Sequence, residues 1–220
     1  MKHLRTALVN LIILALAAFI YAALTSPASV MALAKSSSLP VYRCAGGKEV
    51  SIQCAVTWDA AALGEIMKTL RDEGVRITFA VSCGWAENNP EMLKRMAAEG
   101  HGIAVTVAEK GGGEDAETKL ERACLTVESI TGMRPTLAVL TGTEDPGFVK
   151  AAEKLSLTPV ICTFDLGTGG KCPERLSGGS IITVRPTREL SMALPNLIDL
   201  IKKAGLDIVP THILLYNSMG

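Results

Sequence analysis

Histidine is scarce in this sequence, and the cysteine spacings that mark zinc sites are missing. Of the 220 residues only three are histidines, and two of these, His3 and His212, lie near the ends of the chain. The six cysteines form no CxxC pair, the spacing typical of structural zinc sites. A site built from three imidazoles, or from a compact cysteine motif, is therefore not expected.

Clusters of one charge are also missing. Lysine and arginine number 22, aspartate and glutamate number 22, and the formal net charge is +0 at pH 7. The sequence contains no long basic run. Neither nucleic acid nor an anionic membrane surface is therefore expected as a partner on electrostatic grounds.

The N-terminal residues predict export. A positively charged flank at residues 1–5 precedes an apolar run at 7–24, and the small residues Ala32 and Ala34 follow. Residues 1–34 are therefore interpreted as a signal peptide that is cleaved, or as a hydrophobic helix that remains as a membrane anchor, since the run is long enough for either. Residues 35–48 are interpreted as a linker and residues 49–220 as one domain, located outside the cytoplasm.

Apolar runs alternate with helical periodicity along residues 49–220. Such alternation predicts parallel strands joined by helical crossovers, hence an α/β barrel or a doubly wound sheet. About seven strands favour a distorted (β/α) barrel, preceded by the N-terminal hydrophobic helix. The expected strands are 50–56, 75–81, 102–107, 136–140, 159–164, 180–184 and 207–209, and the expected helices are 60–73, 89–99, 116–131, 146–155 and 190–204.

Several segments resemble one family. Residues 77–81 (ITFAV), 85–91 (WAENNPE) and 94–103 (KRMAAEGHGI) follow one another as in the polysaccharide deacetylase, or NodB-like, family, and residues 130–135 (ITGMRP) and 179–182 (GSII) resemble later segments of it. The resemblance implies a barrel with its site at the C-terminal ends of the strands. It also implies metal-assisted removal of acetyl groups from N-acetylglucosamine or N-acetylmuramic acid units of chitin-like polymers or peptidoglycan.

The residues that carry this chemistry in the family are largely replaced here. The resemblance implies a metal, such as zinc, held by one aspartate and two histidines, with a second aspartate as base. Aligned without a gap, the two aspartates fall on Ala55 and Val56, and the two histidines on Thr106 and Lys110. Val56, Thr106 and Lys110 cannot supply a zinc ligand set. No cofactor is therefore expected.

A second alignment and three further positions complete the comparison with the family. Shifting the first strand retains Asp59 as a candidate base and places Ala60 at the metal aspartate. The arginine that orients the base becomes Val139. The histidine of the last motif becomes Arg185, which stays protonated near neutral pH. Asp165 is the polar position that still matches.

These replacements predict a pseudoenzyme that binds cell-wall glycan or an envelope protein, tethered to the membrane if the N-terminal helix is retained. The alternative is an active carbohydrate deacetylase, a hydrolase of non-peptide carbon–nitrogen bonds, using Asp59 or Asp165. A purely structural envelope protein is a third hypothesis. His101 is interpreted as a hydrogen-bonded structural residue rather than as the partner of a nucleophilic Cys83. A disulfide between Cys44 and Cys172 is left open.

Overall fold

The computed structural model describes residues 40–45, 47–58, 61–107, 115–142, 145–167 and 176–218. The predicted signal peptide or anchor at residues 1–34 lies outside these ranges, as do residues 35–39 and 46 of the predicted linker. Within the described ranges, no helix has the length and apolar character needed to cross a membrane.

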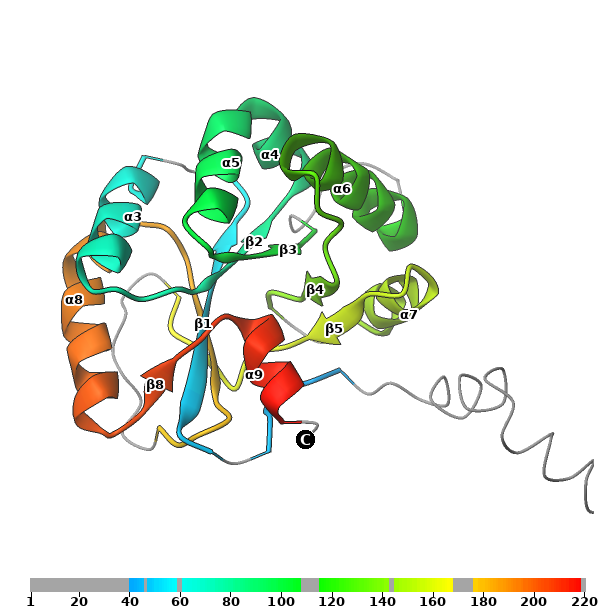
Figure 1. The fold of residues 1–220 in the computed structure, drawn as a ribbon. Helices are drawn as coiled ribbons and strands as arrows, with labels where there is room; N and C mark the ends of the chain where they lie inside the picture. The colour runs from blue at the N-terminus through cyan, green and yellow to red at the C-terminus, as the bar shows by residue number, and fades with distance from the viewer. Residues whose placement is uncertain are drawn as a thin grey trace, which may run out of the picture. The chain divides into compact units, whose positions relative to one another are not determined.

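One parallel sheet, curled into part of a barrel, forms the centre of the domain (Figure 1). Its strands follow the order β5-β4-β3-β2-β1-β7-β6, and β8 pairs in parallel with the start of β1. This arrangement confirms the predicted barrel of about seven parallel strands. The strands are β1 (Glu49–Val56), β2 (Thr78–Val81), β3 (Gly102–Val105), β4 (Leu137–Val139), β5 (Thr158–Val160), β6 (Phe164–Asp165), β7 (Ile181–Val184) and β8 (Asp207–Ile208).

Helices follow most strands, and most of them cover the outer face of the sheet (Figure 1), as crossovers between parallel strands require. The last helix instead places Leu214 and Leu215 in a cluster on the inner side of the sheet. Two short helices, α4 and α9, were not expected from the sequence. The described helices are α3 (Leu63–Asp72), α4 (Cys83–Asn88), α5 (Pro90–Ala98), α6 (Ala116–Thr131), α7 (Pro146–Lys154), α8 (Arg188–Lys203) and α9 (Thr211–Asn217).

The central strand β1 is buried on both faces, and the two faces differ in chemistry. Successive side chains of a strand point to opposite sides of the sheet. The outward side chains pack in the main hydrophobic cluster, which also contains residues of α3 and α8; they are Val50, Ile52, Cys54 and Val56. The inward side chains, Ser51, Gln53 and Ala55, are polar or small. They lie on the side of a second, smaller cluster that includes Ala80, Ala104 and Val139.

The apolar run at residues 159–164 was expected to be one strand, and this prediction was wrong. Its first part belongs to β5 and its last part to β6, and these two strands occupy opposite edges of the sheet. Residues 161–163 carry the chain from one edge to the other. Local hydrophobicity could not reveal this crossing because strand order depends on pairing between distant segments.

Residues 41–43, within the range interpreted as a linker, make backbone contacts with the domain. Val41 bridges to Val160 in β5, and Arg43 bridges to Ser180 beside β7. Arg43 Nη2 also donates to the carbonyl oxygen of Gly178 at 3.1 Å. This short segment thus connects the β5 edge with the other end of the curled sheet.

Candidate functional site

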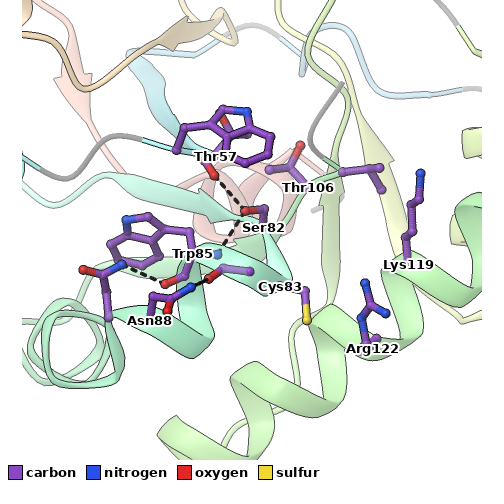
Figure 2. A pocket seen from close by; sticks show the side chains of 12 residues that line it. Thr57, Ser82, Cys83, Trp85, Asn88, Thr106, Lys119 and Arg122 are labelled. Carbon is purple, nitrogen blue, oxygen red and sulfur yellow. Dashed lines mark hydrogen bonds between the residues drawn. The ribbon is translucent and has the colours of Figure 1, made fainter. Parts of the chain in front are cut away.

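A cavity of about 280 Å³ opens where the first three strands end (Figure 2). Thr57 and Trp58 follow β1, Ser82 and Cys83 follow β2, and Thr106 follows β3. Because these strands are parallel and in register, their C-terminal ends meet at one edge of the sheet. Residues of α4 and α6 complete the wall, and the full lining consists of Thr57, Trp58, Ser82, Cys83, Gly84, Trp85, Asn88, Asn89, Thr106, Val107, Lys119 and Arg122.

Hydroxyl groups at the strand ends are held by neighbouring backbone. Ser82 Oγ donates to the carbonyl oxygen of Thr57 at 3.1 Å and accepts from the backbone N–H of Trp85 at 3.4 Å, which caps helix α4 (Figure 2). Thr106 Oγ1 donates to the carbonyl oxygen of Val139 at 2.8 Å. Thr106 is only 2% exposed. Its hydroxyl proton is therefore held in a hydrogen bond to the backbone of β4.

The α4 and α6 walls differ in character. Trp85, which is 3% exposed, is part of the α4 wall, and its indole Nε1 is buried without a hydrogen-bond partner. Lys119 and Arg122 project from α6, on the same side as Cys83 (Figure 2). Their spacing of three residues places both on one face of the helix.

Cys83 does not form a catalytic pair with His101. Its Sγ lies 3.2 Å from Glu87 Oε1 and 3.4 Å from Thr126 Oγ1. His101 precedes Gly102, the first residue of β3, so it lies at the end of that strand opposite the cavity. A cysteine hydrolase built on these two residues is therefore ruled out by distance along β3.

His101 is a structural residue, as expected from the sequence. Its Nδ1 accepts a hydrogen bond from the backbone N–H of Ile77 at 3.2 Å, and its ring packs edge-on against Phe79 with centroids 5.2 Å apart. Burial lowers the pKa of His101, the charge of Glu99 opposes this shift, and the charge of Arg76 adds to it. The buried ring is thus held neutral near neutral pH.

The family positions predicted from the gapless alignment fall in different environments. Val56 packs in the outer hydrophobic cluster, on the helix side of the sheet, whereas Ala55 faces the interior opposite Ala80. Val139 is buried in the inner cluster and meets Thr106 through its carbonyl oxygen. Asp59 and Lys110 lie outside the described residues.

Arg185 and Asp165 are brought together at the ends of β7 and β6. Two hydrogen bonds join them, Nη1 to Oδ1 at 3.0 Å and Nη2 to Oδ2 at 3.1 Å. Asp165 Oδ1 also accepts from the backbone N–H of Gly167 at 2.8 Å. Asp165, which the sequence suggested as a catalytic remnant, therefore forms an ion pair with the guanidinium of Arg185. Both side chains are about one-third exposed.

The described lining does not fit a divalent metal. It contains no aspartate, glutamate or histidine. Throughout the described ranges, no three His, Cys, Asp or Glu side chains gather closely enough to hold a metal ion. The lining is instead made of hydroxyls, amides, indoles and two cations, which suit hydrogen bonding and stacking rather than Lewis-acid chemistry.

Sequence reasoning missed Ser82, Asn88, Lys119 and Arg122 as residues of the cavity. Ser82 carried a local signal, because a serine directly after a strand is a frequent helix N-cap. Lys119 and Arg122 carried a weaker one. They flank the buried residues Leu120 and Ala123 of α6, but which sheet edge that helix borders depends on the fold.

Comparison with known proteins agrees with this geometry. The family model for polysaccharide deacetylase matches residues 48–160. No curated protein matches the sequence. The fold is similar to that of BA3943 from Bacillus anthracis, described as a CE4 family pseudoenzyme, with a TM-score of 0.71, 20% identity, and coverage of 81% of this chain and 69% of that one. A BA3943 mutant described as having restored enzymatic activity gives the same score and identity, with coverage of 81% and 72%.

A protein described as a deacetylase also has a similar fold. The Bc1960 peptidoglycan N-acetylglucosamine deacetylase superimposes with a TM-score of 0.69 at 19% identity, over 77% of this chain and 89% of that one. Similar folds thus occur in a protein described as a deacetylase and in one described as a pseudoenzyme. At this level of identity the likeness establishes the deacetylase-like fold, and the side chains at the strand ends must decide the chemistry.

Proposed function

Because the chain belongs to the polysaccharide deacetylase family, we propose that it is a catalytically silent, exported member that binds cell-wall glycan at the strand-end cavity. The observation that carries this proposal is the lining of that cavity. It offers hydroxyl, amide and indole groups for a sugar but, among its described residues, no carboxylate or imidazole for a metal. Export rests on residues 1–34, and fractionation of the full chain would test it.

A glycan is favoured over an envelope protein by the form of the site. Small-ligand sites are concave, with a few polar groups converging on the ligand. The cavity is bordered by three strand ends and two helices, and its hydroxyls and amides come from Thr57, Ser82, Asn88, Asn89 and Thr106. The peptidoglycan specificity of Bc1960, a protein of similar fold, agrees with a glycan ligand.

The position of Val56 supports the shifted alignment as the better placement of the ancestral aspartates. An aspartate at Val56 would be buried among the apolar side chains of α3 and α8. Asp59 and Ala60 instead follow Thr57 and Trp58, which line the cavity. In this proposal Asp59 is the surviving base position and Ala60 the lost metal aspartate.

Restoring the metal ligands tests the proposal directly. The wild-type full chain should bind no zinc at one equivalent, measured by metal analysis after dialysis, and should release no acetate from chitin or peptidoglycan fragments. The variant with Ala60→Asp, Thr106→His and Lys110→His should gain zinc affinity, because it would again carry the one aspartate and two histidines that the family resemblance implies as ligands. Restored activity in the BA3943 mutant is the precedent for this design.

A matched variant separates the two alignments. Replacing Ala60→Asp by Val56→Asp, with the same two histidines, should give no zinc site and should destabilise the protein by several kcal/mol (about 2–5), since the carboxylate would be buried among apolar groups. Tightly bound zinc or deacetylation by the wild type would overturn the pseudoenzyme proposal. Zinc binding by the Val56→Asp set alone would overturn the shifted alignment.

A further inference from the structure

The amide groups of Asn88 and Asn89, which line the cavity beside α4, are held by the backbone of that helix (Figure 2). Asn88 Nδ2 donates to the carbonyl oxygen of Gly84 at 2.7 Å, and Asn89 Nδ2 donates to that of Trp85 at 2.9 Å. A carbonyl oxygen can only accept, so these bonds fix which amide atom is the nitrogen. Neither amide oxygen Oδ1 accepts a hydrogen bond from the residues that the structure describes, so both can accept one from a ligand.

Two hydroxyl groups at the strand ends have no proton left to donate to a ligand. Ser82 Oγ donates to the carbonyl oxygen of Thr57, and Thr106 Oγ1 donates to that of Val139. A hydroxyl group carries a single proton, so both protons are engaged. The polar side-chain groups that remain for a ligand on these walls are therefore mainly acceptors, which suit a ligand rich in hydrogen-bond donors.

The charges of the cavity lining do not require an anionic ligand. Lys119 and Arg122, on the α6 wall, each have an interaction within the protein. The described lining contains no carboxylate or imidazole. An uncharged ligand therefore suits the cavity, because it avoids the cost of burying a charge without a partner.

An exposed tryptophan borders the same cavity. Trp58 is 78% exposed, whereas Ser82, Trp85 and Thr106 are buried. The face of an indole suits the C–H face of a pyranose ring, which carries the partial positive charge that the π system attracts. A sugar ring thus offers both things that the site can bind, since its edge carries hydroxyl donors and its face carries C–H groups.

We propose that the cavity recognises the hydroxyl groups of a neutral glycan and not its acetamido groups. Sugar hydroxyls donate to Oδ1 of Asn88 and Asn89, and a ring packs on Trp58. Replacing an acetamido group by a hydroxyl keeps a donor at that carbon, so the two amide oxygens lose no partner. This inference rests on the proposed function and names the ligand class of the same site, which is neutral, hydroxyl-rich glycan with or without N-acetyl groups.

The test compares two oligosaccharides of equal length, a cello-oligosaccharide with a hydroxyl group at C2 and a chito-oligosaccharide with an acetamido group there. Calorimetry with the full chain should give affinities that agree within about threefold. A cello-oligosaccharide whose hydroxyls are O-methylated should bind at least about tenfold more weakly, because its donors are lost. Asn88→Ala should weaken both unmodified oligosaccharides by a similar factor, about fivefold.

Intrinsic fluorescence gives a second measure of binding. The chain contains two tryptophans, of which Trp85 is buried and Trp58 is exposed. A sugar ring on Trp58 should therefore shift the emission to shorter wavelength, as water leaves the indole. The shift should be absent in Trp58→Phe, which keeps an aromatic ring at the cavity.

Matched controls guard against general effects of substitution. Asn196→Ala removes an exposed amide on α8, and Tyr216→Ala removes an aromatic side chain that is 80% exposed on α9; neither should alter binding. Each variant must show the thermal unfolding of a folded protein before its affinity is compared.

The outcomes distinguish the two proposals. Binding of the chito-oligosaccharide more than about tenfold tighter than that of the cello-oligosaccharide would overturn recognition through hydroxyls, while leaving glycan binding intact. Unchanged affinity in Asn88→Ala, or undiminished binding of the O-methylated oligosaccharide, would overturn it as well. Failure of the wild type to bind either unmodified oligosaccharide or peptidoglycan fragments would overturn the proposed function itself.

Discussion

The two faces of strand β1 are equally buried but have different consequences for the protein. The outward face consists of Val50, Ile52, Cys54 and Val56, packed against helices. The inward face consists of Ser51, Gln53 and Ala55, and Thr57 at the cavity continues the same alternation. The outward face therefore carries most of the hydrophobic stabilisation, whereas the inward face leads to the site. Burial alone therefore does not tell the stabilising face of β1 from the face that leads to the site. The polarity and size of alternate side chains do.

Truncating a side chain on the outward face of β1 should have the largest effect on the free energy of unfolding. Ile52→Ala removes a fully buried side chain and should lower the free energy of unfolding by about 2–5 kcal/mol, because it leaves a cavity in the main cluster. The neighbouring variant Ser51→Ala removes only the hydrogen bond between Ser51 Oγ and Thr211 Oγ1, 2.8 Å long, and should lower it by about 1 kcal/mol. Urea unfolding of both variants measures the difference. Equal losses would contradict the assignment of stability to the outward face.

Adding a methyl group on the inward side of the sheet, at Gly102 in β3, should have a smaller effect on the free energy of unfolding. A Cβ at Gly102 would lie 2.9 Å from Thr78 Oγ1 and 3.0 Å from His212 Nδ1. Thr78 Oγ1 cannot move freely, because it accepts from the backbone N–H of Thr211 at 2.8 Å. Gly102→Ala should therefore lower the free energy of unfolding by about 1–3 kcal/mol.

Gly64 in α3 provides the control for this substitution. A Cβ there would meet no atom within 4 Å. Gly64→Ala should raise the free energy of unfolding by about 0.5–1 kcal/mol, since alanine favours a helix more than glycine does. Thermal unfolding monitored by circular dichroism would show opposite shifts of the midpoint for the two variants. A shift of the same sign would contradict the close packing of the inward face.

The two described histidines should have the smallest effect at pH 7, and their contribution should appear only as a pH dependence of the free energy of unfolding. Burial lowers the pKa of both His101 and His212. The unfolded chain takes up protons as the pH falls below about 6.5, where the folded protein does not, so the free energy of unfolding should decrease from pH 7 towards pH 5. Each histidine can contribute a slope of at most about 1.4 kcal/mol per pH unit.

Glutamine variants separate the two contributions. His101→Gln keeps a side chain of similar length but no proton-binding group, so it should reduce the slope. His212→Gln should reduce it independently, because His212 lies beside Gly102 on the inward side while His101 packs against Phe79 on the outward side. A slope that is unchanged in both variants would show that carboxylates, not these histidines, cause the acid sensitivity.

The sequence predicted the parts of the fold that depend on local periodicity. The helix expected at 116–131 is α6 itself, and the strand expected at 50–56 is β1 less one residue. α4 was missed because six residues give too short a repeat to detect. α9 was missed because it is only seven residues long and directly follows Pro210, a residue that more often interrupts a helical pattern. The crossing from β5 to β6 depends on long-range pairing and has no local signature.

The candidate site was predictable only in outline. The resemblance to the deacetylase family located it at the strand ends, and Thr57, Trp58 and Thr106 do lie there. The direction in which Val56 points could have been read from the alternation of β1, since it shares a face with Ile52 and Cys54. The presence of Lys119 and Arg122 in the cavity lining could not have been predicted from the sequence, because it depends on how α6 packs beside α4.

The bridge made by residues 41–43 sets a limit on when the domain can close during synthesis. Arg43 contacts Gly178 across 135 residues of sequence, and Val41 joins β5. Bringing such distant segments together has an entropic cost that must be met before the contact forms. Val41 can pair once residue 160 has been synthesised, whereas Arg43 must wait for residues 178–180. Until residue 180 has emerged, the curled sheet therefore stays open beside β7, and the nascent chain exposes a strand edge that can pair with other chains.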